Sequence, residues 1–244
     1  MATSTTSSDN PSTTRARERL LDAAEALVYA GGIHATGVDA IVRQSGTARK
    51  SFYTHFGSKD ALVAAALERR DERWMNWFSG NTLAQGTTPR ARLIGMFDVL
   101  REWFSSDDFH GCAFLNAAGE IEAADDPIRI VAREHKARLL RFVRQMCDDY
   151  VASTAPDAVV QDKQNRQNRQ GRQNRQDDQR TARAARLSRQ WLILIDGAIG
   201  VALVSGDADA ALDARAAAGQ LLEADSMVSR PSVRRVSTQR QEKS

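Results

Sequence analysis

Residues 45–62, SGTARKSFYTHFGSKDAL, limit the possible folds of this 244-residue chain more than any other stretch. Gly46 can adopt the left-handed backbone conformation that a sharp turn between two helices needs. Thr47 is then placed to cap the helix that follows. In that helix Phe52 and Phe56 lie four residues apart, so both can face the same buried side. The stretch predicts a turn followed by a short helix with one apolar face.

The residues on either side predict two more helices. Thr36 and Asp39 have the spacing of a capping box, so a short helix with an apolar face can begin there and precede the turn. Gly57 can end the helix after the turn, and Ser58 can cap the next one. Two short helices at a steep angle form a helix-turn-helix unit, a structure that places its second helix in the major groove of DNA.

The second helix of this unit carries hydrogen-bond donors on the faces that Phe52 does not occupy. These residues are Arg49, Lys50, Tyr53, Thr54 and His55. No carboxylate occurs between Asp39 and Asp60, so the local charge is positive. Lys59 falls in the first turn of the next helix, where a cation opposes the helix dipole. We therefore expect Lys59 to serve a group outside the fold, with phosphate as the candidate.

Residues from about 15 to 76 resemble the DNA-binding domain of the TetR/AcrR family of bacterial transcriptional regulators. The resemblance rests on Thr36 ahead of the first short helix, on Phe-Tyr-Thr-His-Phe at 52–56, and on Gly-Ser-Lys-Asp-Ala-Leu at 57–62. It implies an all-α fold, with a helix-turn-helix motif at about 38–56 that is joined to a larger helical domain. That second domain would bind a small-molecule effector and form a homodimer.

Three departures from the family pattern bear on DNA recognition. Val42 stands where the family usually has Ala, Thr47 and Ala48 stand where it has an apolar residue plus Ser, and Lys50 replaces a Gly. That glycine lets the backbone of family members approach the duplex closely. Lys50 must instead point along the groove or reach a phosphate, so the operator sequence cannot be inferred by analogy.

The motif and the resemblance together predict the DNA-contacting residues. We expect contacts from Thr36, Gly37, Val38, Thr47, Ala48, Arg49, Lys50, Tyr53, Thr54, His55 and Lys59. Phosphate contacts position a protein on DNA and base contacts select the sequence. We expect the phosphate contacts to come from Thr36, Thr47, Tyr53 and Lys59. The residues expected nearer to base edges are Arg49, Lys50, Thr54 and His55.

Helical periodicity continues through the rest of the chain, and polar segments interrupt it. The predicted organisation is a disordered tail at 1–14, the DNA-binding domain at 15–76, an effector-binding and dimerisation domain at 77–225, and a disordered basic tail at 226–244. Residues 161–180 contain no apolar side chain and repeat Gln-Asn-Arg, which predicts a low-complexity loop. This loop and the C-terminal tail carry +3 and +4, so the basic isoelectric point does not describe the folded body.

Two helices near the C-terminus are predicted to form the dimer interface, at about 181–205 and 208–223. The first is apolar on nearly every face around Trp191, and Gly197 and Gly200 leave room for a neighbouring helix. In the resembled family, the last two helices form a four-helix interface. A symmetric dimer would present two recognition helices about 34 Å apart, the spacing of successive major grooves in a palindromic site.

The resemblance also implies an effector pocket in the second domain. The large or polar residues that can line it are Phe97, Trp103, Phe104, Cys112, Phe114, Asn116, Glu120, His135, Met146 and Trp191. For each one taken alone, plain core packing is the better interpretation. His135 then is a hydrogen-bonded histidine on an otherwise apolar stripe. Cys112 is a small buried thiol, with a redox switch as the alternative.

Nothing in the sequence indicates catalysis, a cofactor or a metal site. The four histidines lack metal-ligand spacing, and neither a phosphate-binding glycine loop nor a Gly-x-Ser-x-Gly motif occurs. With only two cysteines and no apolar signal region, a cytoplasmic protein without a membrane span is expected. The resulting prediction is a homodimeric repressor that an effector releases from a palindromic operator. The alternatives are an activating or architectural DNA-binding protein controlled by a protein partner and, less favoured, an enzyme that degrades the effector.

Overall fold

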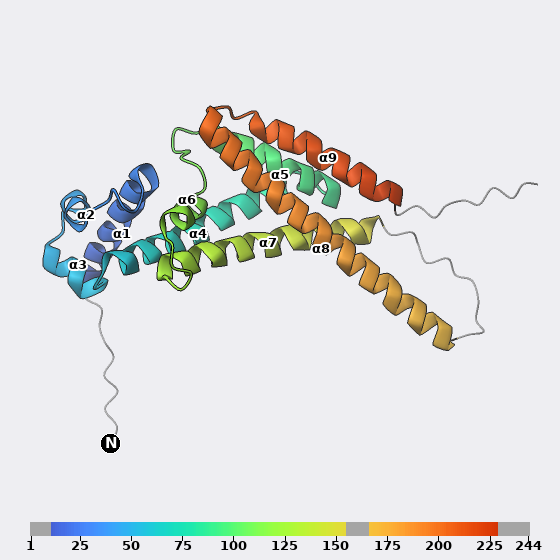
Figure 1. Cartoon of the computed structure of the whole chain (residues 1–244), viewed down its shortest axis with the longest axis horizontal. Helices are drawn as coiled ribbons and strands as arrows, with labels where there is room; N and C mark the ends of the chain where they lie inside the picture. The colour runs from blue at the N-terminus through green and yellow to red at the C-terminus, as the bar shows by residue number, and fades with distance from the viewer. Residues whose placement is uncertain (1–10, 155–165, 229–244) are drawn as a thin grey trace, which may run out of the picture.

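The chain forms a bundle of α-helices, which Figure 1 shows in a computed structural model that describes residues 11–154 and 166–228. Their bounds are α1 Pro11–Gly31, α2 Val38–Ser45, α3 Arg49–His55, α4 Lys59–Ala84, α5 Pro89–Phe104, α6 Ala113–Glu120, α7 Pro127–Ser153, α8 Arg166–Ser205 and α9 Ala210–Val228. The described residues contain no strand. The predicted all-α fold class, with an N-terminal helix-turn-helix unit joined to a larger helical part, is confirmed.

The first three helices and the beginning of α4 enclose a small hydrophobic core. Leu20 of α1, Ile41 of α2, Phe52 of α3 and Leu62 of α4 are almost completely buried in it. Phe56, four residues after Phe52, packs against the same cluster as predicted. We call this part of the molecule, residues 11 to about 66, the head; it lies at one end of the molecule in Figure 1.

A second and larger hydrophobic core holds the rest of the chain together. The second half of α4 and helices α5 to α9 contribute to it, and Phe78, Phe97 and Trp191 are fully buried there. The indole of Trp191 donates a hydrogen bond to the Leu93 carbonyl at 3.2 Å, which satisfies its only polar atom. Helix α4 belongs to both cores, so it connects the head to the larger bundle (Figure 1).

The glycine turns and one of the three predicted caps are confirmed. Gly46 and Gly57 have φ angles of +59° and +72°, in the left-handed region that glycine adopts without strain. The Ser58 hydroxyl accepts a hydrogen bond of 3.1 Å from the Ala61 amide and caps α4. Pro89 and Pro127 begin α5 and α7, where a missing N–H costs no helical hydrogen bond.

The predicted caps of α2 and α3 are wrong. Gly37 and Ala48 occupy the N-cap positions, and neither helix has a side-chain cap. The Thr36 hydroxyl instead donates to the Gly32 carbonyl at 2.7 Å, and that of Thr47 lies 2.8 Å from the Ser45 hydroxyl. Both threonine hydroxyls therefore form hydrogen bonds within the turn that precedes the helix. Each threonine stands one residue ahead of the N-cap, where the carbonyls and hydroxyls of that turn are within its reach.

The predicted loop at 161–180 is also wrong over its larger part, because α8 already begins at Arg166; residues 161–165 lie outside the described residues. Arginine and glutamine favour helix, and the lack of apolar side chains argued only against a buried core. Pairs at helical spacing support this extension, with the Gln173 amide 3.2 Å from Asp177 and Arg180 3.7 Å from the same carboxylate. Figure 1 shows this half of α8 projecting beyond the bundle.

Three other helices also extend beyond the boundaries predicted from the sequence. Helix α1 begins at Pro11, within the segment predicted as a tail, and α9 continues to Val228 rather than ending near 223. Helix α4 extends to Ala84, past residue 76, where the predicted DNA-binding domain ends. Residues 1–10 and 229–244, where the rest of the predicted tails falls, lie outside the described residues.

One described stretch, Gln173–Ser205 of α8, is long enough to cross a membrane and contains an 18-residue window with a mean hydropathy of 1.5. The same helix packs along α7 and α9, and Trp191, Ile195 and Ile199 are buried there. A core helix of a bundle meets the same criteria of length and composition. Composition therefore does not distinguish a membrane-crossing helix from a core helix for α8. The packing of α8 against α7 and α9 favours a core helix.

Candidate functional site

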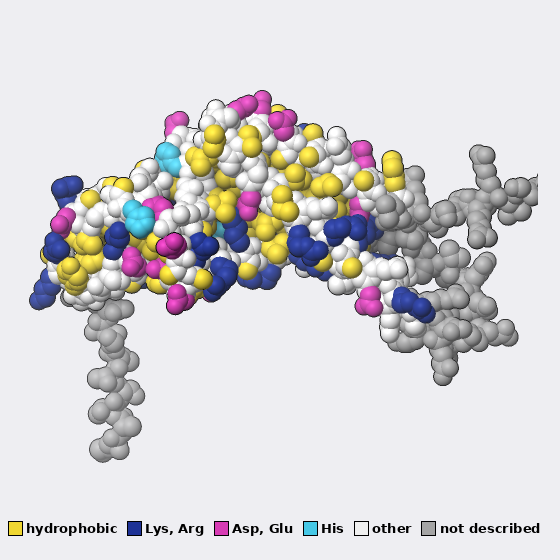
Figure 2. All heavy atoms as spheres, in the orientation of Figure 1, with side chains coloured by type: hydrophobic (Ala, Val, Ile, Leu, Met, Phe, Trp, Pro, Cys, Tyr) yellow, Lys and Arg dark blue, Asp and Glu magenta, His cyan; other side chains and the backbone are white. Residues whose placement is uncertain are grey.

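Helix α3 presents its polar residues on the outside of the head. Arg49, Lys50 and Thr54 are exposed, and 52% of the Tyr53 surface is accessible. His55 is half-buried beside Phe56. Figure 2 shows Lys and Arg side chains at the free end of the head, over α2 and α3. The helix after the turn thus offers donors to an anionic partner while Phe52 anchors it from behind.

Several of these donors already have partners within the head. The Arg49 guanidinium forms an ion pair with Asp39 of α2 and lies 5.9 Å from the centre of the Tyr53 ring. The Thr54 hydroxyl donates to the Lys50 carbonyl at 2.9 Å. Both partners of the Arg49 pair are largely exposed, so the pair is weak and can open when a phosphate approaches.

Lys59, which is expected to serve a group outside the fold, also has a partner within it. Its ammonium group donates a hydrogen bond of 3.0 Å to the Ile33 carbonyl in the loop between α1 and α2. Thr36 in the same loop is only 4% exposed, whereas Gly37 is exposed and Val38 is half-buried. A lysine has three donors, so Lys59 can hold this loop and still present an N–H outward.

Most residues predicted to line an effector pocket lie in the larger core, in line with the core-packing interpretation given for each one alone. The buried members are Phe97, Phe104, Cys112, Phe114, His135, Met146 and Trp191. Trp103 is half-buried, and Asn116 is exposed and donates to the His110 carbonyl at 3.0 Å. Of the predicted set, only Trp103 lines the larger of the two cavities described below.

Glu120 has a different role from the one predicted. Its carboxylate accepts hydrogen bonds from the Ile33 and His34 amides, each 2.9 Å long, and its carbonyl lies 2.9 Å from Nε2 of His34. The end of α6 is thereby fastened to the loop that connects α1 and α2. Glu120 and Lys59 bind the same short loop from two sides, so this loop links the head to the larger bundle.

His135 is buried in a polar cluster that joins α4, α6 and α7. Its Nδ1 lies 2.6 Å from Oδ1 of Asp71, and Arg138 donates to the other oxygen of Asp71 at 3.0 Å. The Phe114 ring stacks on the imidazole with a centroid distance of 3.7 Å. The predicted interpretation of His135 as a hydrogen-bonded core histidine is therefore confirmed. Its partner Asp71 is 64 residues away in the chain, and no local pattern pointed to it.

The surroundings of this cluster shift the pKa values of its members. Burial lowers the pKa of His135, but the hydrogen bonds to Asp71 and Cys112 outweigh it and raise the pKa overall. Burial raises the pKa of Asp71, while His135 and Arg138 lower it to a net value below the usual range. The pKa of Cys112 is also lowered, since His135 and Lys136 outweigh the effect of burial.

The two cysteines differ in these surroundings. Cys112 is the N-cap residue of α6, and its Sγ accepts the Leu115 amide at 3.5 Å. Burial raises the pKa of Cys147 to about 12, so that thiol is inert at neutral pH. Both thiols are free and buried. No group of three or more His, Cys, Asp or Glu side chains within residues 11–154 and 166–228 is arranged to hold a metal ion.

A cavity of about 510 Å³ opens where the head meets the loop between α5 and α6. Its lining comes from three elements: Asp22, Glu25, Ala26, Tyr29 and Ala30 of α1, Arg69, Arg70 and Arg73 of α4, and Trp103, Asp108 and His110 at the end of α5 and in the following loop. A neighbouring cavity of about 10 Å³ beside Ala113 is too small for a ligand. Sequence reasoning missed the larger cavity, because its walls are far apart in the chain.

Comparisons of sequence and of structure both relate this chain to bacterial transcriptional regulators. The sequence profile described as "Bacterial regulatory proteins, tetR family" matches residues 20–66. An uncharacterized HTH-type transcriptional regulator in the lacX 3' region of Lactococcus lactis is 28% identical over 118 residues, and the HTH-type transcriptional regulator LmrA of Bacillus subtilis is 28% identical over 120 residues. These matches span 46% and 48% of this chain and 58% and 63% of the two relatives.

The likeness in three dimensions extends over most of the chain. The crystal structure of a putative TetR transcriptional regulator from Streptomyces avermitilis superposes with a TM-score of 0.64 and 27% sequence identity. That superposition covers 86% of this chain and 97% of the other. The profile match places the relationship in the helix-turn-helix head, and the superposition carries it into the larger bundle. Residues 20–66 therefore match the TetR family of bacterial regulatory proteins, and the fold of the chain is similar to that of a putative TetR transcriptional regulator.

Proposed function

We propose that this protein is a sequence-specific, DNA-binding transcriptional regulator that acts as a homodimeric repressor on a palindromic operator. The observation that carries this proposal is α3, a short helix anchored by Phe52 whose outward side chains are exposed donors. It follows a turn that requires the left-handed Gly46. The match of residues 20–66 to the TetR profile and the names of the relatives, both HTH-type transcriptional regulators, support the same function.

Homodimerisation is proposed to use α8 and α9. In the single chain Ile193 is 70% and Val204 is 88% exposed, and a Cβ built on Gly197 or Gly200 meets nothing within 4 Å. These four residues recur at three- and four-residue steps and form one stripe of α8. An apolar stripe of this kind favours burial against a second helix pair. A symmetric partner would supply that pair and a second copy of α3.

Regulation by a small molecule completes the proposed function. An effector that binds better to a dimer with altered head spacing would shift the population away from DNA. A coupling of about 1 to 3 kcal/mol between the two sites is sufficient for a large change in occupancy. Helix α4 supports this proposal, because it belongs to both cores and any tilt of it moves the head. A cytoplasmic location and the absence of catalytic activity follow from the same proposal.

The alternative within DNA binding is an activating or architectural protein that responds to a protein partner. Titration of small molecules into the protein–operator complex separates the two: release by a metabolite supports the repressor, and release only by a protein supports the alternative. An enzyme would need a reactive group that meets a substrate. Cys112 and His135 are the described pair closest to that description, and both are buried.

The direct test is a binding titration with a palindrome from the upstream region of the protein's own gene. Tyr53→Ala is expected to weaken all duplexes alike, and Lys50→Ala to change the preference among operator variants. Arg141→Ala is the matched control, since Arg141 is an exposed cation on α7, outside the head. Equal operator selectivity after Lys50→Ala would contradict its assigned role. Equal affinity of the native protein for all duplexes at moderate salt would refute sequence-specific binding.

A further inference from the structure

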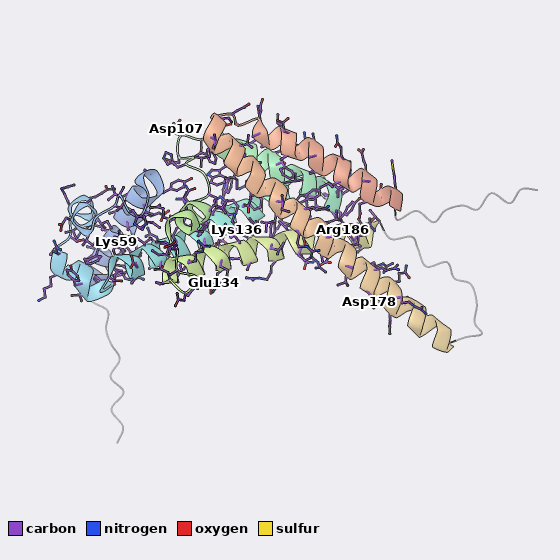
Figure 3. All side chains as sticks on the ribbon, in the orientation of Figure 1. Lys59, Asp107, Glu134, Lys136, Asp178 and Arg186 are labelled. Carbon is purple, nitrogen blue, oxygen red and sulfur yellow. The ribbon has the colours of Figure 1, made fainter. Side chains whose placement is uncertain are left out.

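The cavity between the head and the α5–α6 loop has the size and position of a ligand site. Its volume of about 510 Å³ falls within the roughly 300 to 1,000 Å³ of small-molecule sites, which occur preferentially where domains meet. Figure 1 shows the α5–α6 loop beside the end of α1, and Asp107 of that loop is labelled in Figure 3. A molecule bound here would touch α1, α4 and the loop together.

One wall of the cavity carries three guanidinium groups that are paired unevenly with carboxylates. Glu25 of α1 is only 12% exposed in its side chain and receives Arg69 at 3.3 Å, Arg70 at 3.1 Å and also Arg73. The other two acids nearby, Glu18 and Asp22, both bind Arg69, at 3.0 and 2.7 Å. Arg70 and Arg73 therefore share a single carboxylate while Arg69 contacts three, so the incompletely paired guanidinium groups of this wall are those of Arg70 and Arg73.

Arg70 and Arg73 also keep donors that can reach a ligand. The hydrogen bond found for each engages one guanidinium nitrogen, although a guanidinium has five N–H groups in a planar fork. The Arg73 side chain is 54% exposed. A planar fork with free N–H groups matches a carboxylate, which can accept two parallel hydrogen bonds from it.

Flat apolar surfaces complete the cavity. The Tyr29 ring is covered on one side by the Arg70 guanidinium, 3.5 Å from the ring centre, and meets the His110 ring edge-on at 5.1 Å. Its hydroxyl donates to the Gly111 carbonyl and accepts the His110 amide, both at 3.0 Å, so the ring is held in place. Trp103 lines the same space. Rigid aromatic walls favour a ligand with a planar apolar part.

Asp108 adds a limit on the charge of that ligand. It lines the cavity from the α5–α6 loop, and no hydrogen bond or ion pair is found for it among the described residues. A second negative charge on the ligand would be repelled by Asp108 once the first is bound by arginine. The arrangement therefore selects a singly charged carboxylate over a doubly charged phosphate ester.

We propose that this cavity is a binding site for a planar organic monoanion, such as an aromatic carboxylate, held by Arg70 and Arg73 against Tyr29 and Trp103. Its role as an effector site rests on the proposed regulatory function, whereas binding itself does not. A carboxylate that binds Arg73 competes with Glu25 and loosens the contact between α1 and α4. Occupancy of the site would thereby change how the head is held.

The test uses the full chain without DNA and three probes of similar shape, followed by calorimetry or equilibrium dialysis. These are 2-naphthoate, its uncharged amide 2-naphthamide, and 2-naphthyl phosphate. We expect 2-naphthoate to bind about tenfold more tightly than the amide, which is the scale of one charge-assisted hydrogen bond. 2-Naphthoate should also bind more tightly than 2-naphthyl phosphate. Asp108→Asn should reduce the difference in affinity between these two anions.

Variants assign the binding to this cavity. Arg73→Gln is expected to reduce 2-naphthoate affinity by about fivefold or more, while Arg141→Gln on α7 leaves it within about twofold. The half-exposed Arg73 can be changed without opening a core, and a circular dichroism melt verifies that the variant folds. Equal binding of acid and amide, unchanged binding by Arg73→Gln, or no binding of 2-naphthoate at millimolar concentration would each overturn the proposal. Operator binding by the same preparation is measured separately. A failure of the anion-site proposal can therefore be distinguished from a failure of the proposed DNA-binding function.

Discussion

Glu120 allows the strength of the connection between the head and the larger bundle to be measured. Its carboxylate accepts two amide hydrogen bonds of 2.9 Å from Ile33 and His34. Glu120→Ala removes both acceptors and leaves the amide of Ile33, a residue 1% exposed, without a partner. An unsatisfied buried donor costs about 1 to 3 kcal/mol, and the His34 amide is exposed and can bind water. We therefore expect a loss of about 2 kcal/mol.

Two measurements check this value. Urea unfolding followed by circular dichroism should show the lower free energy of unfolding, and the melting temperature should fall by about 4 to 8 °C for a chain of this size. Amide exchange at Ile33 and His34 should become about 30-fold faster, which is the same energy expressed as an opening equilibrium. Both changes arise from one contact, so they should appear together.

Glu122→Ala is the matched control, because Glu122 is exposed two residues further on and no hydrogen bond or ion pair is found for it. It should change the free energy of unfolding by less than about 0.5 kcal/mol. If Glu120→Ala behaves like this control and exchange at Ile33 is unchanged, the carboxylate does not hold the loop. The inference that α6 is fastened to the head would then be refuted.

Three further perturbations test other parts of the structure. Val204→Asp should convert the proposed dimer to monomer in analytical ultracentrifugation, whereas Leu115→Asp, at another exposed apolar site, should not. His135 has a raised pKa, so its stabilising contribution is complete below about pH 6.5 and disappears as pH rises through the higher pKa of the folded state. Unfolding free energies from pH 5 to 9 should show this decline, and His135→Asn should remove it. Ser58→Ala should cost about 1 kcal/mol in chemical denaturation through loss of the α4 cap, and an unchanged midpoint would exclude a capping role.

Local chemistry in the sequence was sufficient for the class of fold and for the motif. Left-handed glycines at 46 and 57, the serine cap at 58 and the four-residue spacing of Phe52 and Phe56 act within one or two helical turns. Each is therefore visible in a short window of sequence. The same windows misplaced the caps at Thr36 and Thr47, since the turn before each helix offered nearer partners. Composition likewise misread the first half of α8, because polarity excludes burial and does not exclude a helix.

Tertiary structure alone decided which charged groups meet. Glu25 and Arg70 are 45 residues apart, Asp71 and His135 are 64 apart, and Glu120 and Ile33 are 87 apart. Such pairings follow from how whole helices pack, and no periodicity within one helix encodes the partner on another. For the same reason the predicted effector residues proved to be mostly core, while the cavity formed elsewhere, between α1, α4 and the α5–α6 loop. Residue type set what each side chain can bind, and packing set what it reaches.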